Sequence, residues 1–262
     1  MAEGALTGKR LLGVFAHPDD EAYSLAGCMK RYAAEGVVST VLCFTRGEAG
    51  QIGGGVDATR ETLGAVREAE LRAACALVGC TDVRIVGTPD SGTKITEEGI
   101  GAIVEILREL KPDVMVSMEP EGVTRHPDHI AVSSMATEAF GRVRDEGYPG
   151  RLYLAAEPAA SFNAWMHELD TRGIRWISKD DPLYPQPAPD QTIACIVDVS
   201  AVLDAKVAAL KAHASQSDEL VNLLPSDLYV MVLGAESFQR VHPLRAKGEP
   251  AENDLFGALG EA

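Results

Sequence analysis

Short apolar runs alternate with amphipathic segments over roughly the first 145 residues of the chain. Continuous runs of this kind are typical of strands buried on both faces of a parallel sheet. The expected strands are "LLGVFA" from Leu11, "VVSTVLCFT" from Val37, "VRIVG" from Val83 and "DVMVSM" from Asp113. The expected helices span residues 18–34, 61–78, 97–110 and 127–143. This alternation predicts an α/β protein with right-handed crossovers, a Rossmann-like three-layer α/β/α arrangement with a mostly parallel sheet.

The periodicity weakens after "RLYLAAEP", which predicts a strand from Arg151. "TIACIVDVS" predicts a further strand, residues 202–212 a helix, and the proline-rich "DDPLYPQPAPD" a surface connector. The aromatic residues of this part lie in irregular sequence, and we interpret them as core packing in preference to a wall that covers the substrate. They are Phe162, Trp165, Trp176 and Tyr184.

Charge and cysteine content narrow the classes of partner. The net charge is −15, which repels nucleic acid backbones and anionic lipid surfaces, so neither partner is expected. Five cysteines without a CxxC spacing indicate a reducing, cytoplasmic setting. The apolar stretch near the start is too short to span a membrane, and no targeting segment is apparent. Assembly into a homo-oligomer is left open.

Two related segments that share the tripeptide HPD carry the candidate chemistry: "HPDDE" from His17 and "HPDH" from His126. Each follows an expected strand and begins the next expected helix. Because the carboxyl ends of parallel strands share one edge of a sheet, the two segments are expected to converge there.

Residues three apart lie on neighbouring helical turns, so His17 with Asp20, and His126 with His129, can face one centre. Two imidazoles and one carboxylate suit Zn²⁺ and leave a coordination position for water, as in catalytic sites. Asp19 is then available as a base. The same ligand types also describe Fe(II) sites, so Fe²⁺ is the alternative metal.

These segments also fit other interpretations. Proline followed by acids is ordinary for a helix start, so a non-catalytic module with capping carboxylates is the rival of a different class. A phosphate site is disfavoured by the acids, and Ser91 in "PDSGT" lacks the GxSxG frame of a serine hydrolase. His213 is interpreted either as a packing residue or as part of the site, and Glu48 as a loop acid or a neighbour of the site.

The chain resembles the LmbE-like, or PIG-L, family of metal-dependent N-deacetylases. The resemblance rests on "AHPDDE" and "HPDH", with "TRGEAG", "REAELRAACALVG", "PDSG" and "KVAALKAHASQ" agreeing in order. It implies an LmbE-like fold. By this resemblance the metal ligands are His17, Asp20 and His129, and the catalytic residues are Asp19 as general base, His126 as acid and electrostatic stabiliser, and Asp128, which tunes His126.

The resemblance also implies a substrate, an N-acetylated glucosamine conjugate of small size, contacted by Arg67, Asp90 and Arg125. Thr124 stands where the inositol branch of the family has a tyrosine, and Arg125 is similar to the malate branch, so the conjugated group is open. The alternative is an amidase acting on a larger thiol conjugate. We expect a single domain over residues 1–262, with a core over about 10–156 that carries the metal and a later part, about 157–262, that covers the substrate pocket.

Overall fold

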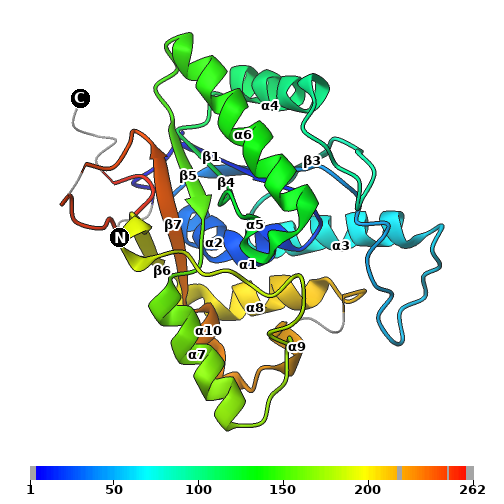
Figure 1. Cartoon of the computed structure of the whole chain (residues 1–262). Coiled ribbons are helices and arrows are strands. Elements are labelled where there is room, and N and C mark those ends of the chain that lie inside the picture. Colours follow the sequence, from blue (N-terminus) through cyan, green and yellow to red (C-terminus); the bar gives the residue numbers. More distant parts are fainter. Residues whose placement is uncertain (1–3, 217–219, 247, 258–262) are drawn as a thin grey trace.

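Seven strands form one mixed sheet, of which β1 to β5 run parallel (Figure 1). The order is β3-β2-β1-β4-β5-β7-β6, and β7 is antiparallel to both β5 and β6. The computed structural model describes residues 4–216, 220–246 and 248–257. The strands are β1 (Arg10–Phe15), β2 (Val38–Cys43), β3 (Asp82–Ile85), β4 (Val114–Met118), β5 (Arg151–Ala155), β6 (Cys195–Asp198) and β7 (Ala235–His242).

Helices cover both faces of this sheet, which gives the expected three layers (Figure 1). The helices are α1 (Asp20–Ser24), α2 (Ala26–Ala34), α3 (Leu63–Leu77), α4 (Glu97–Leu110), α5 (Gly122–Arg125), α6 (Pro127–Asp145), α7 (Ala159–Thr171), α8 (Leu203–Ala212), α9 (Leu220–Leu223) and α10 (Tyr229–Leu233). α4 and α6 pack on one face; α2, α3 and α8 pack on the other. Within the described ranges, no helix combines the length and apolar composition that crossing a bilayer requires.

The central strands β1, β4 and β5 are mostly apolar because each contributes side chains to two cores. Along β1, Leu12 and Val14 face the core under α4 and α6, whereas Leu11 and Phe15 face the core under α2 and α3. Burying one such side chain fully contributes about 1.5–3 kcal/mol to stability. The continuous apolar runs in the sequence therefore reflect burial on both faces.

Three expectations about elements were wrong. The helix expected over residues 18–34 is two helices, because the backbone leaves the helical conformation at Leu25 (φ −146°, ψ −7°). α7 occupies a stretch that we took to be irregular, and β7 lies where no strand was expected. In β7 the inward position next to Phe238 is taken by Glu236, a charged residue that interrupts the apolar pattern of a strand.

The two HPD segments sit at the topological switch point of the sheet. β1 and β4 are neighbours, yet the chain leaves β1 for α1 and α2 on one face and leaves β4 for α6 on the other. In open α/β sheets ligands bind in the crevice that such a divergence opens beyond the strand ends. His17 and His129 lie at this crevice.

Candidate metal centre

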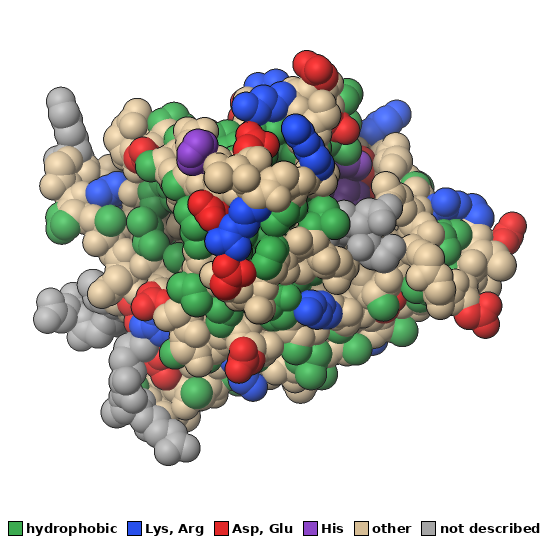
Figure 2. All heavy atoms as spheres, turned by 90° about the horizontal axis from the view of Figure 1, so that it is seen from below, with side chains coloured by type: hydrophobic (Ala, Val, Ile, Leu, Met, Phe, Trp, Pro, Cys, Tyr) green, Lys and Arg blue, Asp and Glu red, His purple; other side chains and the backbone are tan. Residues whose placement is uncertain are grey.

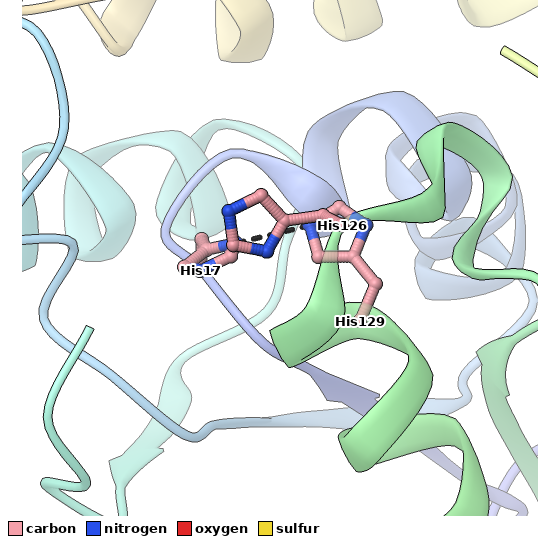
Figure 3. A group of neighbouring side chains, drawn as sticks. All are labelled: His17, His126 and His129. Atoms are coloured by element: carbon pink, nitrogen blue, oxygen red, sulfur yellow. Dashed lines mark hydrogen bonds between the residues drawn. The ribbon is translucent and has the colours of Figure 1, made fainter. Parts of the chain in front are cut away.

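Three imidazoles from two distant segments meet beyond the ends of β1 and β4. His17 comes from the loop after β1, His126 directly precedes α6, and His129 lies in its first turn; their rings are grouped together (Figure 3). His126 is the N-cap of α6, where its Nδ1 accepts from the Asp128 amide at 3.2 Å. The chain therefore brings together the histidines of both HPD segments, as expected.

Hydrogen bonds fix which nitrogen of each ring is available. His129 Nδ1 lies 2.9 Å from the carbonyl of Gly122 and donates to it, which leaves the Nε2 lone pair free. His17 Nε2 lies 3.1 Å from an Asp90 oxygen and 3.4 Å from an Asp128 oxygen. The remaining atoms, His17 Nδ1 and His129 Nε2, lie 3.0 Å apart. Metal-binding histidines are commonly oriented in this way by their second nitrogen.

The Asp20 carboxylate completes this group. Its Oδ1 lies 3.3 Å from His129 Nε2, and its Oδ2 lies 3.8 Å from His17 Nδ1 and accepts from the His17 amide at 2.8 Å. Two imidazole nitrogens and a carboxylate are a donor set that suits a divalent transition metal. The donors therefore fit a metal ion, and most of their surface is shielded from solvent.

The described residues also offer other groupings of ligand atoms. Those of His17, His126 and His129 all lie within 4.8 Å of one another, as do those of His17, Asp90 and Asp128. In the second grouping, Asp90 and Asp128 face the ring nitrogen of His17 that points away from His129. His126 is therefore the alternative to Asp20 as the third ligand beside His17 and His129.

Burial and the neighbouring carboxylates shift the pKa values of the two imidazoles in opposite directions. Burial lowers the pKa of His17, but hydrogen bonds with Asp128 and Asp90 and the charge of Asp20 outweigh it and raise that pKa to about 10. Burial and the charge of His17 lower the pKa of His129 to about 4. The carboxylates around His17 therefore favour positive charge on its ring, and a metal ion that binds to this ring has to displace a proton.

Asp19 is held in an unusual conformation beside the ligand group. Its φ is 121°, in the region that non-glycine residues rarely adopt, and its side chain is less buried than that of Asp20. Arg67 donates to its carboxylate at 2.5 Å, and its own amide donates to Glu21 at 2.9 Å. These two contacts fix both the backbone and the carboxylate of Asp19.

Glu21, which accepts from the Asp19 amide, forms a buried pair with His213 that the sequence did not predict. The second Glu21 oxygen lies 2.9 Å from His213 Nε2, and both side chains are almost fully buried. His213 therefore belongs to the surroundings of the site, one of the two interpretations left open. Glu21 had been given no role, although it is the last letter of "HPDDE".

The three residues expected to contact a substrate are placed differently. Arg67 is buried and, besides Asp19, donates to the carbonyls of Pro18 and Gly47. Asp90 faces His17 and accepts from the Ala49 amide; despite burial, its hydrogen bond with His17 lowers its pKa. Arg125 is exposed and does not line the cavity described below. Their substrate contacts stay predictions.

Two further contacts concern Asp128 and Glu48. The Asp128 carboxylate accepts from the amides of Ser91 and Thr93 at 2.8 and 3.2 Å, so the loop after β3 is tied to the first turn of α6. Glu48 accepts from the Asp90 amide at 3.0 Å. The tuning of His126 by Asp128 stays a prediction, since the Asp128 carboxylate contacts His17 and these two amides.

A cavity of about 470 Å³ opens beside the ligand group. Asp19, Asp20 and His129 line one end of it. Histidine side chains are visible in a recess of the face seen in Figure 2, which carries many hydrophobic side chains. Much of the rest of the lining is apolar, and we call its principal members the apolar wall: Phe162, Trp165, Trp176, Leu183, Leu220 and Leu233.

Comparisons with known sequences agree with this geometry. A sequence model of PIG-L, described as GlcNAc-PI de-N-acetylase, matches residues 12–140. The chain is 32% identical over 293 residues to a 1D-myo-inositol 2-acetamido-2-deoxy-alpha-D-glucopyranoside deacetylase of Rhodococcus erythropolis, covering 97% of this chain and 98% of the relative. A protein of the same description from Acidothermus cellulolyticus is 33% identical over 286 residues, covering 96% and 95%.

Solved structures share the fold. The 4-carboxy-2-hydroxymuconate hydratase of Pseudomonas putida matches with a TM-score of 0.64 at 20% identity, over 91% of this chain and 98% of that one. The N,N'-diacetylchitobiose deacetylase of Pyrococcus horikoshii matches with a TM-score of 0.61 at 20% identity, over 89% and 84%. A hydratase and a deacetylase on one fold show that the reaction has to be argued from the site.

Proposed function

Since the chain belongs to the PIG-L family of de-N-acetylases, we propose that it is a metal-dependent hydrolase that removes the N-acetyl group from an N-acetylglucosamine-type conjugate. The observation that carries the proposal is the pairing of His17 Nδ1 with His129 Nε2 beside Asp20, with each ring's other nitrogen already engaged. The descriptions of the full-length relatives support the substrate class. They name a small acetylated aminosugar as the partner.

His17, Asp20 and His129 are the residues that would hold the metal, and we propose zinc, with Fe²⁺ as the alternative. When bound, such an ion polarises an acetyl carbonyl and lowers the pKa of water to about 7. Asp90 and Asp128 support this role because they accept from His17 on the side away from the ligand group. Neutral ring nitrogens at the ligand positions are the condition for binding.

Asp19 is proposed as the general base, which takes a proton from the water that attacks the acetyl carbon. Its carboxylate reaches the cavity, and the guanidinium of Arg67 donates to it at 2.5 Å and so fixes its orientation. His126 is proposed to stabilise the developing negative charge and to donate a proton to the leaving amine. Arg67 and Glu21 position Asp19, so their role in the reaction is exerted through it.

The organisation of the chain is part of the same proposal. We assign the metal to a core over about residues 10–156 and the cover of the substrate pocket to the part after about residue 157, within one domain. Residues from both parts line the cavity, which supports this assignment. The five cysteines are all buried free thiols, which supports a cytoplasmic setting.

The test is amine release coupled to metal content. Purified protein should release free amine from the N-acetylglucosaminyl-inositol conjugate or from simpler N-acetylglucosamine glycosides, lose this activity with a chelator, and regain it with zinc or ferrous iron. Asp19→Asn should keep the metal and lower turnover by about 10²- to 10⁴-fold, because an amide cannot accept the proton. Protein that takes up neither metal and releases no amine would refute the function.

A further inference from the structure

The cavity beside the metal centre is unlike a site for a polyol. The apolar wall occupies much of its lining, and aromatic rings pack within it: Phe162 and Trp165 at a centroid distance of 4.8 Å, Trp165 and Trp176 at 5.8 Å. A volume of about 470 Å³ is sufficient for a group much larger than an acetyl methyl. Asp19 and Asp20 line the same cavity as the apolar wall, so one ligand can contact the wall and place its amide at the ligand group.

The charged groups of the lining are already paired within the chain. Lys206 Nζ lies 2.8 Å from a Glu236 oxygen, and the Glu236 carboxylate also accepts from the amides of Gly27 and Cys28 at 2.8 Å each. Glu157 accepts from the Trp165 indole at 3.2 Å. The Tyr23 hydroxyl accepts from the Val221 amide at 3.3 Å. A ligand hydroxyl placed here would have to compete with these partners.

An inositol ring therefore fits this wall poorly. It carries a hydroxyl on each of its remaining carbons, and burying such groups without partners is unfavourable. Apart from the residues of the ligand group, the remaining polar groups of the lining are the hydroxyls of Ser24, Thr124 and Ser237 and the indole N–H of Trp176. The wall lies beyond residues 12–140, the part that the family model matches, in later segments that the full-length relatives also cover.

From these observations we infer that the substrate of this enzyme carries a large apolar group, aromatic or aliphatic, which the apolar wall binds while the amide lies at the metal centre. The inference rests on the proposed deacylation and specifies its substrate class. The apolar group can enter from either side of the amide: as the group attached to the sugar, or as an acyl chain longer than acetyl. In both cases the reaction is hydrolysis of the amide C–N bond by water, which gives a carboxylate and a free amine.

A panel of glucosamine amides distinguishes the two sides. The reference is the methyl glycoside of N-acetylglucosamine, and the benzyl glycoside adds an apolar group on the sugar side. The methyl glycoside of N-hexanoylglucosamine adds one on the acyl side, and the inositol conjugate is the polar comparison. We expect kcat/KM to be at least about tenfold higher for the benzyl or the hexanoyl compound than for the reference and the inositol conjugate, as is usual for a filled apolar pocket.

Binding can be followed independently of turnover. Both tryptophans of the chain, Trp165 and Trp176, line the cavity, so intrinsic fluorescence reports directly on its occupation. Titrating the benzyl glycoside into metal-loaded protein should change the emission saturably, whereas the methyl glycoside should not at the same concentrations. No fluorescence change with either apolar compound would overturn the inference.

A matched pair of variants tests the wall itself. Leu183 is 40% exposed and lines the cavity; Leu77 is 46% exposed at the end of α3 and does not line it. Leu183→Ser should lower the ratio of kcat/KM for the preferred apolar compound to that for the reference about tenfold. Leu77→Ser should leave the ratio unchanged. An unaltered ratio in both variants would overturn the assignment of the wall.

The two proposals fail in different ways. If the reference and the inositol conjugate are cleaved as fast as the apolar compounds, the deacetylase stands and the apolar subsite is wrong. If the apolar compounds bind with a tryptophan signal but no compound releases amine with zinc or iron present, the subsite stands and the proposed reaction is wrong.

Discussion

The metal centre and the apolar wall are adjacent but are built in opposite ways. The metal centre consists of two short segments, residues 17–20 and 126–129, whose polar groups are oriented by hydrogen bonds. The backbone of Asp19 adopts an unusual positive φ there. The wall is assembled from α7, α9, α10 and a connecting loop, and it is held by packing of apolar side chains. Local geometry therefore sets the reaction, while the packing of the later segments sets which amide reaches it.

The largest expected effect is on metal affinity, and it distinguishes the role of His129 from that of His126. His129→Ala should lower the metal affinity by more than about 100-fold. Loss of a residue that only supports a metal ligand typically lowers it about 10- to 100-fold, and His129 is proposed as a ligand itself. His126→Ala should retain the metal and lower turnover by about 10²- to 10⁴-fold, because it removes an acid rather than a ligand. Metal analysis and amine release on both variants measure this difference.

Equal metal loss in the two variants would make His126 a ligand, in line with the grouping of the three imidazoles within 4.8 Å. It would then compete with Asp20, and the role of the acid would need another residue. The ratio of rates on apolar and reference amides should be unchanged in His126→Ala, because the residue does not line the apolar wall.

The next effect concerns the stability of the wall's support. Lys206 and Glu236 are almost fully buried as an ion pair, and removal of one partner leaves an uncompensated charge. Lys206→Met should therefore lower the free energy of unfolding by about 3–5 kcal/mol. Urea unfolding measures the change. The double variant Lys206→Met with Glu236→Gln should recover part of the loss, and no recovery would mean that the pair acts through packing instead.

Much of the metal centre was predictable from the sequence, because its signals are local. The apolar run from Leu11 ends at His17 and marks the end of β1, and the i,i+3 spacing within each HPD segment places both of its ends at the ligand group. The contacts of Arg67 with Asp19 and of His213 with Glu21 join segments far apart in sequence, so no spacing encodes them. The family resemblance had pointed to Arg67 as a residue that contacts the substrate.

The wall was less predictable, for two physical reasons. α7 did carry a helical signal, since Phe162, Trp165 and Leu169 recur at i, i+3 and i+7, but the surrounding irregular sequence hid it. β7 carried almost none, because Glu236 takes an inward position that an apolar residue normally occupies and is tolerated only through Lys206 on a different helix. Tertiary pairing, not local pattern, makes this strand.

The smallest expected effect is the difference in metal affinity between variants of Asp90 and of Asp128, the two carboxylates that contact His17. Asp90 and Asp128 both face His17 Nε2, but the Asp90 oxygen is nearer, at 3.1 Å against 3.4 Å, and Asp128 also accepts from two backbone amides. Asp90→Asn should weaken metal affinity about 10- to 100-fold, because an amide orients and polarises the imidazole less than a carboxylate does. Asp128→Asn should weaken it less, at the lower end of that range.

Competition with a zinc-binding dye measures both affinities, and the rate ratio between apolar and reference amides supplies the control. If the metal centre and the wall are independent in function, Asp90→Asn lowers both rates at limiting metal by the same factor and leaves the ratio unchanged. A changed ratio would mean that Asp90 contacts the sugar, as the family resemblance implies, because loss of such a contact penalises the substrate that depends most on its sugar. The same variant thus decides whether Asp90 acts through His17 or on the substrate.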